Sequence, residues 1–388
     1  MKTLVLGGGF GGIVAAHSLR NELGDQHDVT LVSQDAEFYL RAAFPRVAFE
    51  AETSREDIRL PLHETLTPRG IEFRQARATA IRPDRNAVET SAGDLEYDYL
   101  IIALGTHYAA ERVPGLKEHS YSLWTVAEAE RLRDRLRQFD GGSFVTGAAP
   151  GSPCEGPTWE ATLHLDHRLR QRGVRERAEI HLVTTKPNLL APAGPEGVRW
   201  AKETFGALRV KTYTDGEIVE LTADRVVLRD GREIRSDISL IMAPYLGHDV
   251  VRQSGLGDPA AFISVDAHMR STSHRNVFAI GDAVSMPEKP KMAHNAMRGA
   301  KVAAANIARE IQGNAADVTL EYEMMCVVEN GGGRGTYMKS TTPWGGDVSV
   351  VLGAHSGKPG LSPEEAHFIK KAFGDHFLST AGNVQYIM

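Results

Sequence analysis

The chain begins with the stretch MKTLVLGGGFGGIVAAHSLRNELGDQHDVTLVS, which occupies residues 1–33. Its hydrophobic pattern predicts a strand, a helix and a second strand, at Lys2–Leu6, Ile13–Leu23 and Asp28–Val32. The motif G-x-G-x-x-G fills the turn between the first strand and the helix, with its glycines at Gly7, Gly9 and Gly12. A strand, a glycine loop and a helix in this order begin a dinucleotide-binding fold.

The glycine loop predicts a pyrophosphate site at the start of the helix. Glycine lets the backbone approach the phosphates closely, and a helix N-terminus favours negative charge. Phe10 and Gly11 complete the loop and belong to the predicted site. The acid that usually follows the second strand is replaced by Ser33, with Asp35 shortly after it, and either side chain could bond a ribose hydroxyl.

Two later segments each read as a buried strand that ends in a small-residue turn. They are YDYLIIALG at residues 97–105 and NVFAIGDA at residues 276–283. The first ends at Gly105, and the second carries Gly281 and Asp282. We expect the carboxylate of Asp282 beside a ribityl or phosphate chain, and an N-cap role is compatible with that position. The three signals in this order predict that the chain binds FAD.

A second α/β unit lies between these segments, and its loop does not suit a nucleotide. The unit is predicted as a strand, a helix and a strand at Ser143–Gly147, Thr158–Arg172 and Ala178–Thr184. The loop reads GAAPGSPCEGP over residues 147–157, lacks G-x-G-x-x-G and contains three prolines. Proline removes amide donors that a phosphate would need. We therefore expect a second dinucleotide fold that has lost its nucleotide and carries Cys154 instead.

The bulk composition limits the class of protein. A chain of 388 residues, 42% hydrophobic and 24% charged, predicts two globular domains and a smaller appendage. The net charge of −6 argues against nucleic acid as a partner. The first strand follows Met1 almost directly, so we expect no signal peptide and a cytoplasmic protein. The count of two cysteines, taken alone, favours two unrelated free thiols.

Four further segments are more specific than the glycine loop. Two surround the cysteines, CEGPTWE at residues 154–160 and MMCVVENGGGRGTYM at residues 324–338. The others are KPKMAHNAMRGAKVAAANIAREI at residues 289–311 and HFIKKAFGDHF at residues 367–377. Together they resemble the sulfide:quinone oxidoreductase family, and also the flavin subunit of flavocytochrome c sulfide dehydrogenase. The resemblance implies an α/β fold with two Rossmann-like dinucleotide-binding domains, as in disulfide-reductase-like flavoproteins, and a C-terminal appendage.

The resemblance also implies roles for individual residues. In that family two cysteines, here Cys154 and Cys326, face each other on one side of the isoalloxazine through a disulfide or a sulfur bridge. Sulfide would attack the bridge and leave a persulfide on one cysteine, while the thiolate of Cys326 reacts with the flavin. Lys291 would lie near flavin N1/O2 and stabilise the reduced anion. Glu160 could handle protons beside the sulfur chain, and a capping or solvated glutamate is an equally good interpretation.

Further FAD contacts are expected at Arg41 and Ala78. Since no cysteine lies near Arg41, we expect the FAD to be bound non-covalently. The helix predicted from Pro363 to about Leu378 would place Lys370 and Phe373 beside a quinone or other acceptor. Its apolar face equally fits packing against the body of the protein. The same helix is a candidate for weak peripheral docking on the inner face of a membrane.

The order of the motifs predicts the domain boundaries and the function. The segments are an FAD-binding domain at 1–110, a second Rossmann-like domain at 111–235, a return to the FAD domain at 236–317, and a C-terminal cysteine and acceptor region at 318–388. The predicted activity is FAD-dependent oxidation of sulfide to polysulfide or elemental sulfur, with quinone as acceptor. Alternatives are a type-II NADH:quinone dehydrogenase and a flavin subunit that serves a cytochrome. No metal is expected, and a homo-oligomer stays open.

Overall fold

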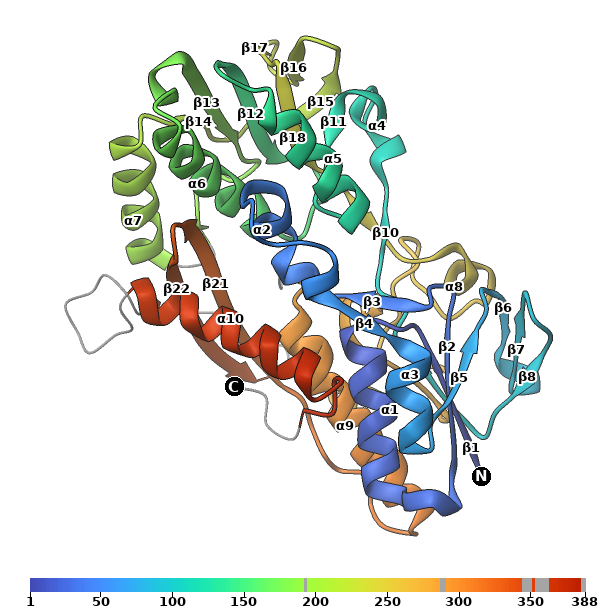
Figure 1. Cartoon of the computed structure of the whole chain (residues 1–388). Helices are drawn as coiled ribbons and strands as arrows, with labels where there is room; N and C mark the ends of the chain where they lie inside the picture. The colour runs from blue at the N-terminus through green and yellow to red at the C-terminus, as the bar shows by residue number, and fades with distance from the viewer. Residues whose placement is uncertain (192–193, 287–290, 344–350, 353–362, 385–388) are drawn as a thin grey trace.

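The chain folds around two parallel sheets, to which a C-terminal hairpin and helix are attached (Figure 1). The computed structural model describes residues 1–191, 194–286, 291–343, 351–352 and 363–384. The first sheet has the order β20-β9-β1-β2-β5, with strands Val277–Ala279, Tyr99–Ile102, Lys2–Leu6, Asp28–Ser33 and Glu72–Gln75. The N-terminal strand β1 lies in this sheet together with β9 and β20, which are the strands of the two later motifs at residues 97–105 and 276–283. The predicted Rossmann-like start is therefore confirmed.

The first sheet is buried on both faces, which explains the unbroken apolar runs in its strands. In β1, Val5 belongs to one hydrophobic cluster, while Leu4 and Leu6 belong to another on the opposite face. Successive side chains of a strand point to opposite faces, so both faces of β1 need an apolar cover. The helices α1 (Phe10–Leu23) and α9 (Ala293–Ile311) pack against each other beside this sheet (Figure 1).

The second sheet has the order β11-β18-β12-β13-β14, and its pairings are parallel. Its strands are Ser120–Tyr121, Ile238–Met242, Gly142–Ala148, Ala178–Val183 and Lys211–Tyr213. The helices of this unit are α5 (Val126–Arg137), α6 (Gly156–Gln171) and α7 (Gly194–Ala207). Strand β18 lies beyond the boundary that the sequence predicted at residue 235, yet it pairs with β12. A buried apolar strand has the same sequence pattern in either sheet. The sequence alone therefore could not assign β18 to the first or the second sheet.

Smaller elements complete the two units. The remaining helices are α2 (Phe44–Phe49), α3 (Leu62–Leu66), α4 (Leu116–His119) and α8 (Asp249–Gln253). Two small three-stranded sheets are formed by β6 (Ala78–Arg82), β7 (Ala87–Thr90) and β8 (Leu95–Glu96), and by β15 (Ile218–Leu221), β16 (Arg225–Leu228) and β17 (Glu233–Arg235). Two strand pairs are β3 (Glu37–Tyr39) with β4 (Arg59–Pro61), and β10 (His107–Tyr108) with β19 (Tyr245–Leu246).

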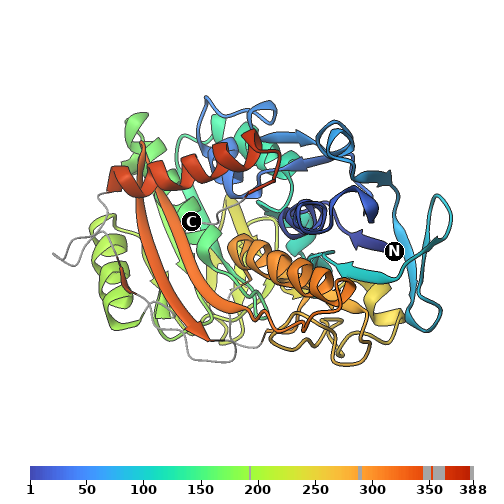
Figure 2. The same cartoon turned by 90° about the horizontal axis from the view of Figure 1, so that it is seen from below.

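The C-terminal region is a long antiparallel hairpin with a helix alongside it. The hairpin consists of β21 (Glu321–Gly331) and β22 (Arg334–Pro343), and β23 (Val351–Leu352) pairs with β22. The helix α10 (Pro363–Ser379) packs against β22 and crosses the hairpin near one of its ends (Figures 1 and 2). Strand β21 packs on α6, so the C-terminal region touches the second sheet's unit. No helix among the described residues is long and apolar enough to span a membrane.

Candidate active site

The glycine loop between β1 and α1 has the geometry of a phosphate cradle. Gly7 has a φ of +113°, and a Cβ there would lie 2.3 Å from the carbonyl oxygen of Ala103. A Cβ on Gly12 would lie 1.8 Å from the carbonyl oxygen of Gly7, so neither position tolerates a side chain. Gly9 is the N-cap of α1, provides no side-chain cap, and has open space around a built Cβ. The first amides of α1 are therefore available to an anionic ligand.

The other predicted FAD contacts lie at or just after the ends of strands around this loop. Ser33 ends β2, and a Cβ on Gly8 would lie 2.8 Å from its hydroxyl oxygen. Gly105 follows β9 with a φ of +70° and open space beside it. Ala78 begins β6 and is half-buried. The residues present fit a dinucleotide, because open backbone positions adjoin an uncapped helix.

Asp282, Lys291 and Arg41 form a charged group near the end of β20. The Lys291 ammonium donates to the carbonyl oxygens of Asp282 at 2.7 Å and Val284 at 2.9 Å. Burial lowers the pKa of Lys291 to about 8, although the charge of Asp282 opposes this shift. Burial raises the pKa of Asp282, against the charges of Lys291 and Arg41. The structure therefore brings together three residues that the sequence predicted as FAD contacts.

Arg41 is held by an aromatic ring as well as by these charges. Its guanidinium carbon lies 4.2 Å from the ring centroid of Trp124. Trp124 stacks in turn on Tyr108, with ring centroids 5.1 Å apart. Burial lowers the pKa of Arg41, which indicates that its charge is poorly hydrated. A weakly hydrated guanidinium is suited to bind an anionic or carbonyl group of a cofactor.

Cys154 lies just before α6, at the place where a nucleotide would bind to the second sheet. The neighbouring residue, Glu155, is the N-cap of α6. The hydroxyl of Thr184, which directly follows β13, donates to the two carboxylate oxygens of Glu155 at 2.8 and 2.9 Å. The carboxylate of Glu155 is thus directed to the end of β13 and makes no capping hydrogen bond to the amides of α6. The loss of the nucleotide from the second fold stays a prediction that rests on the prolines and Cys154 of the loop.

Cys326 lies in β21, on the strand that packs against α6. Both cysteines are half-buried, and they are not bonded to each other in this structure. Burial raises the pKa of the Cys154 thiol to about 11 and that of the Cys326 thiol to about 12. The charge of Cys154 adds to the shift at Cys326, while Lys370 acts in the opposite direction. The two thiols are thus close enough to influence each other electrostatically.

The predicted residues Glu160 and Lys370 form an ion pair beside the cysteines. The Lys370 ammonium on α10 donates to a carboxylate oxygen of Glu160 on α6, and lies 3.2 Å from Glu329 on β21. Burial disfavours the charge of Lys370, but the two carboxylates outweigh burial and raise its pKa. The sequence placed Lys370 at the acceptor and Glu160 at the sulfur chain, and the structure joins them in one cluster.

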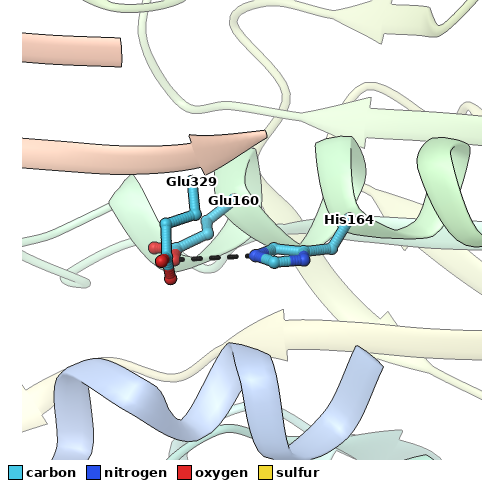
Figure 3. A group of neighbouring side chains, drawn as sticks. All are labelled: Glu160, His164 and Glu329. Atoms are coloured by element: carbon cyan, nitrogen blue, oxygen red, sulfur yellow. Dashed lines mark ion pairs between the residues drawn. The ribbon is translucent and has the colours of Figure 1, made fainter. Parts of the chain in front are cut away.

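Sequence reasoning missed three members of this cluster: His164, Glu329 and Arg46. Figure 3 shows the carboxylates of Glu160 and Glu329 facing the imidazole of His164. The side chain of Glu329 is 1% exposed, and Arg46 lies 3.8 Å from it. Burial opposes ionisation of Glu329, yet Lys370 and Arg46 lower its pKa to about 2. The spacing of Glu160 and His164, one helical turn apart, was the one available sequence signal.

The group of Glu160, His164 and Glu329 also has the residue types of a metal site, since one ligand atom from each lies within 4.8 Å of the others. Lys370, however, pairs with both carboxylates and supplies the positive charge that they need. We therefore assign no metal to this group.

Phe373 and its neighbours on α10 are mainly packing residues. Phe377 is fully buried, with its ring centroid 5.0 Å from that of Phe10 and 5.2 Å from that of Phe38. Phe373 is partly buried and packs against the same core, whereas Phe368 is 68% exposed. These contacts tie α10 to the glycine loop through Phe10. The predicted cofactor contact Phe10 thus has a structural role as well.

Comparisons with known proteins agree with this geometry. The family model described as pyridine nucleotide-disulphide oxidoreductase matches residues 1–300. Sulfide-quinone reductase of Aquifex aeolicus is 29% identical over 97% of this chain and 90% of its own length. The crystal structure of the sulfide:quinone oxidoreductase from that organism superposes with a TM-score of 0.89 and 27% identity, over 99% of this chain and 92% of the other.

A second group of relatives transfers electrons from NADH. Type II NADH:quinone oxidoreductase of Staphylococcus aureus is 24% identical over 99% of this chain and 96% of its own length. The names in both groups describe oxidoreductases that use quinones. The resemblance predicted from the two cysteine segments is confirmed, and the match implies a flavin cofactor. The chain therefore belongs to the pyridine nucleotide-disulphide oxidoreductase family, as an oxidoreductase similar to sulfide:quinone reductases over nearly its full length.

Proposed function

We propose that this protein oxidises sulfide through a Cys154–Cys326 bridge and passes the electrons through FAD to a quinone. The observation that carries the proposal is the exchange at the start of α6. In place of a glycine-rich nucleotide loop, the chain has a segment with three prolines and Cys154 just before the first residue of α6. Cys326 comes to the same place on β21, which packs on α6. The similarity to sulfide:quinone reductases supports the choice of sulfide.

The proposed first step is thiol–disulfide exchange with sulfide as the nucleophile. HS⁻ forms a bond to the sulfur of Cys154, the bond between the two cysteine sulfurs breaks, and its electron pair leaves on Cys326. A second HS⁻ then takes the outer sulfur from Cys154 as HSS⁻. Bound FAD would supply the two-electron acceptor that allows the bridge between Cys154 and Cys326 to close again, and a quinone would remove these electrons. Overall, two HS⁻, one quinone and one proton give HSS⁻ and one quinol.

The surroundings of the cysteines suit this order of events. Burial raises the pKa of both thiols, so neither free thiol is a good nucleophile near neutral pH. In a bridged resting state no free thiol has to react, because sulfide supplies the attacking thiolate. The charge of Lys370 lowers the pKa of Cys326 against the effect of burial. Lys370 therefore helps Cys326 to leave as a thiolate.

The experiment is anaerobic reduction of the purified flavoprotein by sulfide and by NADH. Sulfide should bleach the flavin rapidly, and NADH should not. Cys154→Ser and Cys326→Ser should each abolish rapid bleaching by sulfide and keep the flavin. Dithionite provides the control, because it should still bleach both variants if the cofactor is bound normally. Rapid sulfide bleaching in either variant would reject the bridge mechanism.

The second candidate is a type-II NADH:quinone dehydrogenase, which the full-length similarity to the Staphylococcus aureus enzymes favours. The loop at residues 147–157 argues against it, since its three prolines remove amide donors that a pyrophosphate would need. Bleaching by micromolar NADH would reverse the choice between the two. The third candidate is a flavin subunit that passes electrons to a cytochrome. Faster reoxidation of the reduced flavin by cytochrome c than by a soluble quinone would favour this candidate.

We further propose that FAD is held without a covalent bond. The carrying observation is that the sequence around Arg41, an expected FAD contact, contains no cysteine that could form a thioether to the flavin. Acid precipitation should release all the yellow colour into the supernatant. Flavin that stays with the precipitate would contradict this assignment.

A further inference from the structure

A buried row of titratable side chains leads from the cysteine site toward the surface. Glu160 is the first member, on the second turn of α6 after Cys154. His164 follows one turn later, with its Nε2 3.9 Å from the Oε1 of Glu160. On its other side, the Nδ1 of His164 lies 3.7 Å from the Oε1 of Glu50. The side chain of His164 is 2% exposed and that of Glu50 is 26% exposed, so the row ends at solvent.

The fold fixes His164 between the two carboxylates. Its ring stacks on that of Phe49, the last residue of α2, with centroids 5.8 Å apart and an interplanar angle of 18°. Glu50 is the C-cap of α2, so the same helix end supplies the stacking ring and the outer carboxylate. The Nε2 of His164 has no hydrogen-bond partner although it is buried. A buried imidazole nitrogen that faces a carboxylate without a bond is an unusual arrangement for a packing residue.

The distances permit proton transfer after a small adjustment. Both separations exceed the usual hydrogen-bond range of about 3 Å. A shift of about 1 Å in either carboxylate, or one bridging water, closes each gap. Imidazole can accept a proton on one nitrogen and donate one from the other, so it can pass a proton between two carboxylates.

The charges around His164 leave room for one more proton. The charged groups that face it are Glu160 on its own helix, Glu50 and Arg46 from α2, Glu329 from β21, and Lys370 and His367 from α10. Three carboxylates thus stand against two permanent cations. A net negative charge is costly in a buried cluster, and one proton on a histidine or carboxylate neutralises it. Burial also raises the pKa of Glu50, and the charge of His164 opposes this shift.

We infer that Glu160, His164 and Glu50 form a proton path that links the cysteine site to solvent at the end of α2. The inference rests on the proposed sulfide oxidation, which releases one proton as two HS⁻ become HSS⁻ and two electrons. Quinone reduction then consumes two protons. Each turnover therefore moves protons at a site whose thiols are partly enclosed, and the row of side chains provides a route. Lys370, His367 and Arg46 hold the carboxylates in place and do not themselves carry the proton.

The test is stopped-flow reduction by sulfide in weak buffer with a pH indicator. In the unaltered protein, proton release should keep pace with flavin bleaching. His164→Gln and Glu50→Gln should each slow proton release by about tenfold or more, because a positioned acid–base group contributes at least that much. The bleaching amplitude should stay, and a high concentration of a small buffer should restore part of the rate in Glu50→Gln. The pH profile of bleaching should change in both variants.

The matched control is His181→Gln. His181 is likewise buried, but it lies in β13 beside Tyr213, outside the row. This variant should release protons at the unaltered rate. Proton release at the unaltered rate in His164→Gln would overturn the inference. So would equal slowing of bleaching and proton release with an unchanged pH profile, since that result indicates a packing role alone.

The failure of the proposed function is separable from the failure of this inference. If sulfide does not bleach the unaltered protein, the proposed function falls. The path is then judged by proton uptake when a soluble quinone reoxidises protein that dithionite has reduced. Slower uptake in His164→Gln than in His181→Gln supports the path, and equal uptake overturns it.

Discussion

The replacement Lys370→Met tests the buried charge cluster most directly. Methionine keeps much of the length of lysine but removes the charge that Glu160 and Glu329 share. We expect the folded holoprotein to lose about 3 kcal/mol of stability near neutral pH. The reason is that two buried carboxylates, one on α6 and one on β21, would lose the cation that they share, which leaves Glu329 with Arg46 and His367 and Glu160 with His164. Removing one partner of a buried ion pair typically costs about 3–5 kcal/mol.

The pKa of Glu329 is shifted in the direction that this expectation requires. Lys370 and Arg46, acting against burial, lower it from 4.5 to about 2. A shift of one pKa unit corresponds to about 1.4 kcal/mol, so the lowered value corresponds to a few kcal/mol, on the order of the cost above, to which both Lys370 and Arg46 contribute. The folded pKa lies below the unfolded one, so this stability is present above pH 4.5 and is lost as the pH falls toward 2. The deficit of Lys370→Met should therefore be large at about pH 7 and smaller at about pH 4.

The assay is thermal unfolding followed by flavin fluorescence at both pH values. At about 2 cal/mol/K per residue, a loss of 3 kcal/mol lowers the Tm of a chain of this size by about 4 °C. Lys371→Met is the matched control, since Lys371 pairs with Asp375 on the same helix but is half exposed. It should shift the Tm by about 1 °C or less, because surface ion pairs contribute little. Equal Tm shifts in the two variants would refute the reasoning. So would a Tm shift in Lys370→Met that is the same at both pH values.

Two further predictions concern the cofactor and the acceptor. Because burial lowers the pKa of Lys291 to about 8, its charge is lost as the pH rises through that value, so FAD affinity should fall between about pH 7 and pH 9. Fluorescence titration should show this fall in the unaltered protein and a flat profile in Lys291→Met, and a parallel fall in both would exclude Lys291 as the cause. Phe373→Ala should slow reoxidation by a soluble quinone about tenfold while sulfide reduction keeps its rate, if Phe373 borders the acceptor. Equal slowing of both half-reactions together with a lower Tm would instead assign Phe373 to packing.

The parts of the fold that sequence analysis predicted well are those encoded locally. The glycine loop, its strand and its helix are contiguous, and steric limits at Gly7 and Gly12 leave little choice of residue. The strand ends at Gly105 and Asp282 also carry their signals within a few residues, so their shared sheet could be predicted. Strand β18 shows where this approach fails. Its apolar run is typical of either sheet, and only the pairing with β12 decides its place.

The buried charge cluster could not be predicted, because its members come from four elements that meet only in the folded chain. The residues lie in four different elements: Arg46 in α2, Glu160 in α6, Glu329 in β21 and Lys370 in α10. Glu329 lies three residues after Cys326, and no sequence pattern connects it with Glu160 or Lys370. The fold also changes the interpretation of Lys370, because its charge acts on the pKa of the distant residue Cys326. An assignment to the acceptor alone is therefore too narrow for this residue.

The position of Lys370 has a consequence for how the two half-reactions relate. One ammonium contacts Glu160, the first member of the proposed proton path, and also acts on the pKa of Cys326. When Cys326 leaves as a thiolate, the cluster gains a negative charge, and Lys370 is then shared among three anions instead of two. The added charge makes the buried cluster more negative, and one further proton in the cluster offsets that cost. Opening of the bridge would thus draw a proton toward the cysteines, and its closing would release that proton along α6 to Glu50.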